Sequence, residues 1–280
     1  MNNIKAAFFD IDGTLIEHTV GLEEPRPSTI EALNAMRASG IKVVVASGRT
    51  PQSVGHVTDF AFDGFISANG ALDFADGKLI YKGGLTKEEA IILRDYLIEN
   101  KVGFIMQGDA LFLYGNLEDY GVDRYLQGVR KRDYEKRIEP VSLGKIDDLI
   151  FKATVFFDSI EKMEKTQRDL KGLFNVMIND VNTGSVIADK FNGEVSSLRD
   201  TKGSGIRHLL DYWRIDPKDA IAFGDNSNDL EMFDVVDGYA MGNAVDELKA
   251  KAVEVIGDVN SDTIAEVLIR KGIISLQKIT

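Results

Sequence analysis

The sequence predicts an α/β fold in which a doubly wound parallel sheet is interrupted by an inserted α+β segment. Three short, mostly apolar runs, residues 4–9, 41–46 and 219–223, are each followed by a small or acidic residue. Runs of this length between helical patterns are typical of buried parallel strands, whose carboxyl ends open into ligand-binding loops. The middle of the chain instead alternates pairs of strands with helices, which indicates a separate layer. We therefore expect two domains.

The outer segments supply the parallel sheet. After the first strand, Ser28 and Glu31 have capping-box spacing, and apolar residues recur at helical intervals until Gly40 ends the helix. The resulting βαβ unit places the ends of its two strands side by side. The other elements predicted for these segments are a strand at 64–68, a hairpin at 72–81, a helix capped by Thr201, strands at 235–241 and 253–256, and helices at 245–251 and 263–270.

The inserted segment is assigned to residues 82–192, which leaves 1–81 and 193–280 as the sheet domain. Its predicted elements are a helix at 86–100, a hairpin at 102–107 and 110–114, a helix at 117–130, a strand at 151–157, a helix at 160–172, and strands at 174–180 and 184–188. The crossings near residues 82 and 192 would serve as hinges if this segment opens as a lid.

The composition argues against several classes of function. The 280 residues carry a formal net charge of -12, so a nucleic-acid surface is not expected. The one basic run, 130–137, is interleaved with acids and predicts a solvated face. The sequence contains no cysteine, no long apolar segment and no N-terminal leader. We therefore expect a cytoplasmic protein without membrane partners, disulfides or thiolate metal sites.

Asp10 and Asp12 follow the first strand at a separation of two positions, and Gly13 comes next. A carboxylate at a strand end can attack phosphorus as a nucleophile, while a second carboxylate protonates the leaving oxygen and later deprotonates water. Gly13 allows the backbone to turn sharply past the reacting centre. The alternative is an ordinary Asp-Gly turn after a core strand. The motifs in the rest of the chain are needed to distinguish a catalytic pair of carboxylates from such a turn.

Polar residues also follow two other predicted strands. Ser47 and the amide of Gly48 could hold a phosphoryl oxygen, or could belong to an ordinary turn. Asp225, Asn228 and Asp229 lie in a strand-to-helix loop, where acidic residues often serve only as a helix cap. Carboxylates that converge on one point repel one another unless a cation is present, and hard oxygen ligands suit Mg²⁺.

Lys202 lies at the start of a predicted helix. An ammonium group there could hold a phosphate and offset the charge of a carboxylate nucleophile, although a single lysine is usually solvated. The role of Arg49 stays open between a substrate contact and a surface ion pair. The three histidines are isolated in the sequence, and this chemistry needs no imidazole; they are His18, His56 and His208.

Taken together, four motifs in this order resemble those of the haloacid dehalogenase (HAD) superfamily of phosphatases, specifically its Cof-type branch with a class IIB cap. The motifs are Asp10-Ile11-Asp12-Gly13-Thr14, Ala46-Ser47-Gly48-Arg49, Lys202-Gly203 and Gly224-Asp225-Asn226-Ser227-Asn228-Asp229. Asn69-Gly70-Ala71 is similar to the segment that follows the third core strand in this branch. The resemblance covers essentially the whole chain and implies a Rossmann-like HAD core with an inserted cap that selects the substrate.

The resemblance also implies roles for individual residues. Asp10 is the nucleophile and a Mg²⁺ ligand, and Asp12 is the acid/base, which binds the metal through its main-chain carbonyl. Asp225 is the second carboxylate ligand, while Asp229 orients metal-bound water or Lys202. The phosphate-binding positions are those of Ser47, Gly48, Lys202 and Asn228. One departure is Arg199, which stands where the branch often has glycine; either the loop follows a different path or Arg199 reaches the substrate.

The expected function is Mg²⁺-dependent hydrolysis of phosphomonoesters of small metabolites, with hexose phosphates favoured through the resemblance alone. A phosphotransferase or mutase would instead return the phosphoryl group to a sugar. A phosphate-ligand sensor is disfavoured because all the chemical residues are present, and a receiver-like domain is disfavoured by the inserted cap. The physiological substrate and the oligomeric state stay open.

Overall fold

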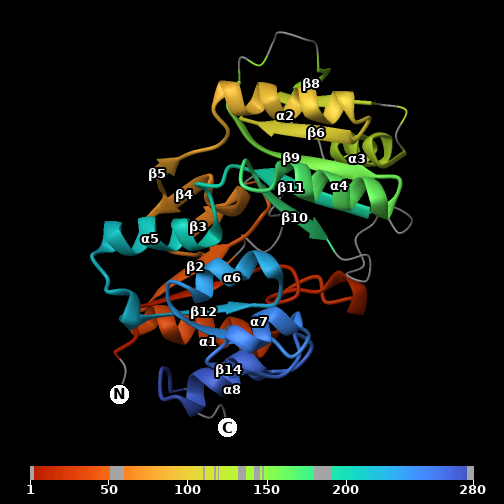
Figure 1. Cartoon of the computed structure of the whole chain (residues 1–280). Coiled ribbons are helices and arrows are strands. Elements are labelled where there is room, and N and C mark those ends of the chain that lie inside the picture. Colours follow the sequence, from red (N-terminus) through yellow and green to blue (C-terminus); the bar gives the residue numbers. More distant parts are fainter. Residues whose placement is uncertain are drawn as a thin grey trace. The chain divides into compact units, whose positions relative to one another are not determined.

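The computed structural model describes residues 3–50, 60–109, 111–116, 118, 120–131, 137–141, 146, 148–179 and 191–275. The chain forms two compact units, drawn in Figure 1: Met1–Lys82 with Thr201–Thr280, and Gly83–Asp200. Each unit contains its own sheet and its own hydrophobic core.

The first unit contains an eight-stranded sheet with the order β14-β13-β12-β1-β2-β3-β4-β5. Its strands are β1 (Ala6–Phe9), β2 (Lys42–Ala46), β3 (Gly64–Ser67), β4 (Leu72–Ala75), β5 (Lys78–Lys82), β12 (Ala220–Gly224), β13 (Asp237–Ala240) and β14 (Glu254–Val255). The strands from β14 to β3 pair in parallel, and β4 and β5 add an antiparallel hairpin at one edge. The predicted doubly wound sheet is confirmed.

Helices cover both faces of this sheet. Successive side chains of β1 alternate between two cores: Ala7 and Phe9 belong to one, and Ala6 and Phe8 to the other. A strand that is buried on both faces requires a continuous apolar run, which is the pattern seen in the sequence. The first core includes residues of α1 (Pro27–Ala38), α7 (Asp246–Lys251) and α8 (Thr263–Arg270), and the second includes residues of α5 (Lys202–Trp213) and α6 (Leu230–Phe233). Short 3₁₀ turns occur at His18–Val20, Ala68–Gly70, Pro217–Asp219 and Ser227–Asp229.

The start of α1 differs from the prediction. The helix begins at Pro27, with Arg26 at the N-cap position and no side-chain cap. The hydroxyl of Ser28 instead donates to Asp262 Oδ1 at 2.6 Å. Proline at the first helical position has no N–H to satisfy and already has a helical φ, so this helix can begin without the predicted capping box.

The second unit contains a six-stranded sheet with the order β10-β11-β9-β6-β7-β8. Its strands are β6 (Gly103–Gly108), β7 (Leu111–Gly115), β8 (Arg137–Pro140), β9 (Ile150–Phe157), β10 (Asn175–Asn179) and β11 (Phe191–Ser196), and its helices are α2 (Lys87–Glu99), α3 (Tyr120–Lys131) and α4 (Ile160–Leu170). All strand pairs are antiparallel except β7 with β8. Across the described parts of both units, no helix has the length and hydropathy needed to cross a membrane.

The second unit differs from the prediction at its C-terminal boundary and in one additional strand. The predicted strand at 184–188 lies outside the described residues, and the observed partner of β10 is β11, which also pairs with β9. The predicted boundary at 192/193 therefore falls inside β11, and the second unit extends to Asp200. β8 is not predicted by the sequence pattern, because Ile138 is its only large apolar residue. Part of the basic run, 132–136, lies outside the described residues.

The first and last residues of the second unit are tied together. The guanidinium of Arg199 donates to both carboxylate oxygens of Glu89, at 2.8 and 2.7 Å, and to the carbonyl of Gly84 at 3.2 Å. The carboxylate of Asp200, which is fully buried, accepts the N–H of Gly84 at 2.7 Å. Arg199 is thus a bidentate partner of the first turn of α2. Its backbone is not left-handed, so this position does not need the glycine that the family branch often has here.

Candidate active site

Asp10 stands at the carboxyl end of β1, in the centre of the sheet. Phe9 is in register with Phe223 of β12 on one side and with Val45 of β2 on the other. The N–H of Asp10 donates to the carbonyl of Phe223 at 3.0 Å, and the Phe9 and Phe223 rings stack with their centroids 4.8 Å apart. Because parallel strands end at the same edge, the residues after β2 and β12 lie on either side of Asp10.

Lys202 joins two acidic residues from different loops. Its Nζ donates to Asp10 Oδ1 and to Asp229 Oδ1, each at 2.6 Å, and its side chain is fully buried. The predicted cap at Thr201 is present and forms a reciprocal capping box with Ser204. The cap fixes the start of α5, and Lys202 is the first residue of this helix. Burial alone would lower the pKa of Lys202, but attraction to Asp10 and Asp229 outweighs it and raises the pKa. The amine is therefore a permanent cation.

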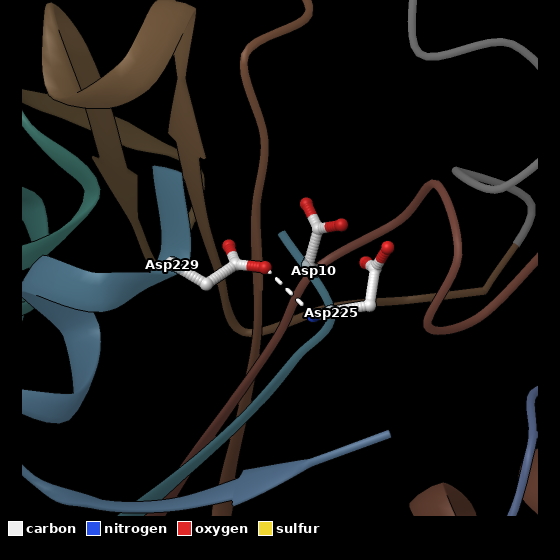
Figure 2. Close-up of side chains that lie close together, drawn as sticks. All are labelled: Asp10, Asp225 and Asp229. Atoms are coloured by element: carbon white, nitrogen blue, oxygen red, sulfur yellow. Dashed lines mark hydrogen bonds between the residues drawn. The ribbon is translucent and has the colours of Figure 1, made fainter. Parts of the chain in front are cut away.

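Three carboxylates lie next to this amine. Single oxygens of Asp10, Asp225 and Asp229 all lie within 4.8 Å of one another. Figure 2 shows the carboxylates of Asp10 and Asp225 pointing in the same direction, whereas that of Asp229 points to the backbone of Asp225. Asp229 Oδ2 accepts the N–H groups of Asp225 and Asn226 at 2.9 and 3.0 Å. Asp229 therefore orients its neighbours, while Asp10 and Asp225 present oxygens of the kind that Mg²⁺ prefers.

Gly13 makes room for Asp225. Its φ is +85°, and a Cβ at this position would lie 2.2 Å from Asp225 Oδ2. On the other side, the Thr14 hydroxyl donates to Asp225 Oδ1 at 3.1 Å. The Asp-Gly step after β1 is thus more than a turn, because it lets the two acidic loops approach each other.

Burial raises the pKa of the Asp10 carboxyl to about 7, even though Lys202 lowers it, and repulsion from Asp229 and Asp12 adds to the increase. The pKa of Asp225 is also raised well above its ordinary value, mainly by burial and then by the charge of Asp10. In the absence of a metal ion, the Asp10 and Asp225 carboxyls therefore retain protons at a higher pH than ordinary aspartates do.

This shift predicts how pH affects the stability of the metal-free protein. Between an unfolded pKa of 3.8 and a folded pKa of about 7, folded Asp10 retains a proton that the unfolded chain has released. The stabilisation is complete below the unfolded pKa and is lost as pH rises through 7. We expect Asp10→Asn, measured in EDTA by denaturant unfolding, to gain stability over the wild type as pH rises from 5 to 8. The gain in the free energy of unfolding should reach a few kcal/mol. If the free energies of the variant and the wild type change with pH in parallel, the prediction is wrong.

Asp12 points to a different partner. Its carboxylate is about half exposed and accepts from Arg49, with Arg49 Nε 2.8 Å from Asp12 Oδ2. Nη2 of the same guanidinium lies 3.4 Å from Nε2 of His18. Of the two roles left open for Arg49, an ion pair is therefore present, but with Asp12 rather than with an unrelated surface acid.

The remaining predicted residues occupy neighbouring loops. Ser47 is buried directly after β2, and its Oγ accepts the N–H of Arg49 at 3.1 Å, so the loop that includes Gly48 is folded over the hydroxyl. Asn228 Nδ2 donates to Asn69 Oδ1 at 3.4 Å. Asn69 has a left-handed backbone, with φ of 55°, which brings the loop after β3 towards Asn228.

Of the histidines, His208 is not isolated in the fold. Its Nδ1 lies 2.6 Å from Oδ2 of the buried Asp73, and its ring packs against Tyr81 at a tilt of 30° with centroids 4.0 Å apart. His18 lies 2.6 Å from a carboxylate oxygen of Glu23, and His56 lies outside the described residues. His208 therefore links α5 to the β4–β5 hairpin.

The chain is similar to known proteins over nearly all of its length. A family model described as haloacid dehalogenase-like hydrolase matches residues 7–268. The curated relative YkrA of Bacillus subtilis (strain 168) is 29% identical over 269 residues, covering 93% of this chain and 95% of that protein. The 5-amino-6-(5-phospho-D-ribitylamino)uracil phosphatase YbjI of Escherichia coli (strain K12) is 26% identical, covering 95% of both chains.

Solved structures show the same arrangement of secondary structure. The structure of the HAD subclass IIB sugar phosphatase BT4131 matches with a TM-score of 0.79 and 26% identity, covering 96% of this chain and 100% of that one. A protein of unassigned function from Geobacillus kaustophilus HTA426 matches with a TM-score of 0.77 and 28% identity, covering 97% and 100%. The similarity therefore extends through both units of the chain.

Proposed function

The chain belongs to the haloacid dehalogenase-like hydrolases, and from this membership we propose that it is a Mg²⁺-dependent phosphatase of small phosphorylated metabolites. The observation that carries the proposal is the buried amine of Lys202, shared by Asp10 and Asp229 beside the carboxylate of Asp225. A structural ion pair would need one carboxylate for one amine. When ionised, three carboxylates around one buried amine would leave negative charge uncompensated, which suits a site that receives a cation.

The residues present fit a magnesium ion. Asp10 and Asp225 would hold it with carboxylate oxygens, and the main-chain carbonyl of Asp12 would be the third protein ligand. Mg²⁺ commonly takes few protein ligands and completes its octahedron with water and phosphate oxygens. When bound, the ion neutralises charge on the transferring phosphoryl group.

In the proposed reaction, a carboxylate oxygen of Asp10 attacks the phosphorus of the substrate. The bond between phosphorus and the ester oxygen breaks, and Asp12 gives its proton to the departing oxygen. Asp12 then takes a proton from water as the water oxygen attacks the aspartyl-phosphate. This second step releases inorganic phosphate, restores the Asp10 carboxylate and returns the proton to Asp12. Because Asp12 is paired with Arg49 in this structure, its carboxyl must leave Arg49 before it acts.

The phosphoryl oxygens would be held by the neighbouring loops. The Ser47 hydroxyl, the N–H of Gly48 and the amide of Asn228 supply hydrogen-bond donors, and Lys202 supplies charge. Donors held in place before the reaction stabilise developing charge without reorganisation. Asp229 assists by holding Lys202.

Sugar phosphates are the proposed substrate class. Support comes from the class IIB sugar phosphatase with a similar structure and from the Escherichia coli relative, whose named substrate carries a phosphorylated ribityl group. In this proposal the second unit, Gly83–Asp200, acts as the cap that selects the leaving group. We place the enzyme in the cytoplasm, with small metabolites rather than nucleic acids or membranes as its partners.

Removal of the metal tests this proposal. With p-nitrophenyl phosphate and a panel of sugar phosphates, we expect phosphate release to fall at least about 100-fold in EDTA and to return on addition of Mg²⁺. Full release in EDTA would contradict the metal requirement. Recovery of a phosphorylated second sugar without free phosphate would instead identify a phosphotransferase or mutase.

A further inference from the structure

The loop 241–245, which follows β13, runs along the backbone of the loop that carries Asp225. The N–H of Met241 donates to the carbonyl of Gly224 at 3.0 Å, and the N–H of Val245 donates to the carbonyl of Asp225 at 2.9 Å. Two backbone hydrogen bonds therefore fix this acidic loop from the side of β13.

Asn243 connects the same loop to the Asp-Gly turn after β1. Its Nδ2 donates to the carbonyl of Gly13 at 2.8 Å, and its Oδ1 accepts the N–H of Val259 at 3.0 Å. The orientation of the amide is unambiguous, because a carbonyl can only accept and an N–H can only donate. Asn243 is thus a bridge with one anchor at Val259 and the other at Gly13.

Two hydrogen bonds, one on each side of the Gly13 Cα, fix two consecutive peptide planes. The N–H of Gly13 donates to the carbonyl of Ile16 at 2.7 Å, which sets the plane containing the Asp12 carbonyl. Asn243 sets the next plane by binding the Gly13 carbonyl. In a trans peptide the C=O and N–H point in opposite directions, so the bond from the Gly13 N–H to Ile16 directs the Asp12 carbonyl away from Ile16, while the Asn243 bond holds the adjoining peptide plane.

The position of Gly13 also determines how closely the two acidic loops approach. Its Cα faces the Asp225 carboxylate so closely that a Cβ would lie 2.2 Å from Oδ2. The loop 241–245 therefore holds both sides of this contact: it binds the Asp225 backbone directly, and it binds Gly13 through Asn243.

We propose that Asn243 is a positioning residue for the divalent cation, because it sets the separation between the Asp12–Gly13 turn and the Asp225 loop. This inference rests on the proposed metal site but adds a residue that does not touch the metal. Asn243 lies outside the four motifs of the sequence and is itself exposed. Outer residues that hold ligands in place typically contribute 10–100-fold to metal affinity.

The test is the Mg²⁺ affinity of the intact protein, measured by calorimetric titration and checked by Mn²⁺ electron paramagnetic resonance. Asn243→Ala removes the bridge, and Asn243→Leu removes the hydrogen bonds while keeping a similar volume. We expect both to bind Mg²⁺ about tenfold more weakly than the wild type. Because the side chain is exposed, their melting temperatures in EDTA should stay close to that of the wild type.

Asn100→Ala is the matched control. Asn100 Nδ2 also donates to a backbone carbonyl, that of Tyr96 at 2.9 Å, but it lies in the second unit. We expect this variant to keep wild-type Mg²⁺ affinity. Wild-type affinity in both Asn243 variants would overturn the inference and leave the proposed function standing, whereas a wild-type protein that binds no Mg²⁺ would overturn both.

Discussion

Asp10→Asn is expected to lower the rate of phosphate release by at least about 10⁴-fold, in line with the loss of a nucleophile in other enzymes. The amide oxygen can still accept a hydrogen bond from Lys202, so the site keeps its shape. It lacks the negative charge that attacks phosphorus, and no aspartyl-phosphate can form. The measurement is multiple-turnover phosphate release at saturating Mg²⁺, with acid-quenched protein analysed for bound phosphoryl groups.

Two controls make this result specific. Asp211→Asn makes the same chemical change at an exposed position of α5 and should keep wild-type turnover. Asp12→Asn should lose turnover but still accumulate the phosphorylated protein from substrates with a good leaving group, because attack by Asp10 precedes the step that needs a base. Turnover undiminished in Asp10→Asn, or a phosphorylated Asp10→Asn protein, would contradict the assignment of the nucleophile.

Much of the site was predictable because three of its residues directly follow buried strands. Asp10, Ser47 and Asp225 each come at or just after the end of a short apolar run. Parallel pairing then brings these ends to one edge of the sheet, whatever their separation in sequence. The cap at Thr201 is also a local signal, and it places the Lys202 side chain at the start of a helix.

Contacts between loops could not be predicted in the same way. The bonds from Arg49 to Asp12 and from Asn243 to Gly13 depend on backbone paths that no periodic pattern encodes. His208 was interpreted as isolated, although its partner Asp73 is buried 135 positions away in sequence. Spacing along the chain carries no information about such pairs.

The predicted boundary of the second unit is wrong for a different reason. β11 reads Phe191-Asn192-Gly193-Glu194-Val195-Ser196, with polar residues and a glycine inside a buried strand. Such a segment has weak intrinsic strand preference, and pairing with both β9 and β10 is what holds it in the sheet. The predicted boundary at 192/193 therefore lies eight residues before the end of the second unit at Asp200.

Lys202→Met is expected to destabilise the metal-free protein by about 3–5 kcal/mol at pH 8, because it leaves buried carboxylates without their cation. Methionine keeps an unbranched side chain, one atom shorter than that of lysine, and removes its charge and hydrogen bonds. The loss of the amine raises the folded pKa of Asp10 still further above its unfolded value, so the destabilisation should grow with pH and be smaller at pH 5. Denaturant unfolding in EDTA at both pH values measures this difference.

The same variant should also lose at least about 100-fold in turnover with Mg²⁺ present, because the phosphoryl group loses a charged donor. Lys218→Met is the matched control: Lys218 is an exposed lysine paired with Asp216, and its loss should change neither stability nor turnover. Equal stability of the two variants at pH 8 would show that the Lys202 amine does not compensate the acidic cluster. Stability recovered on adding Mg²⁺ without recovery of turnover would separate the two tasks of Lys202, since a cation can replace its charge but not its hydrogen bonds to the phosphoryl group.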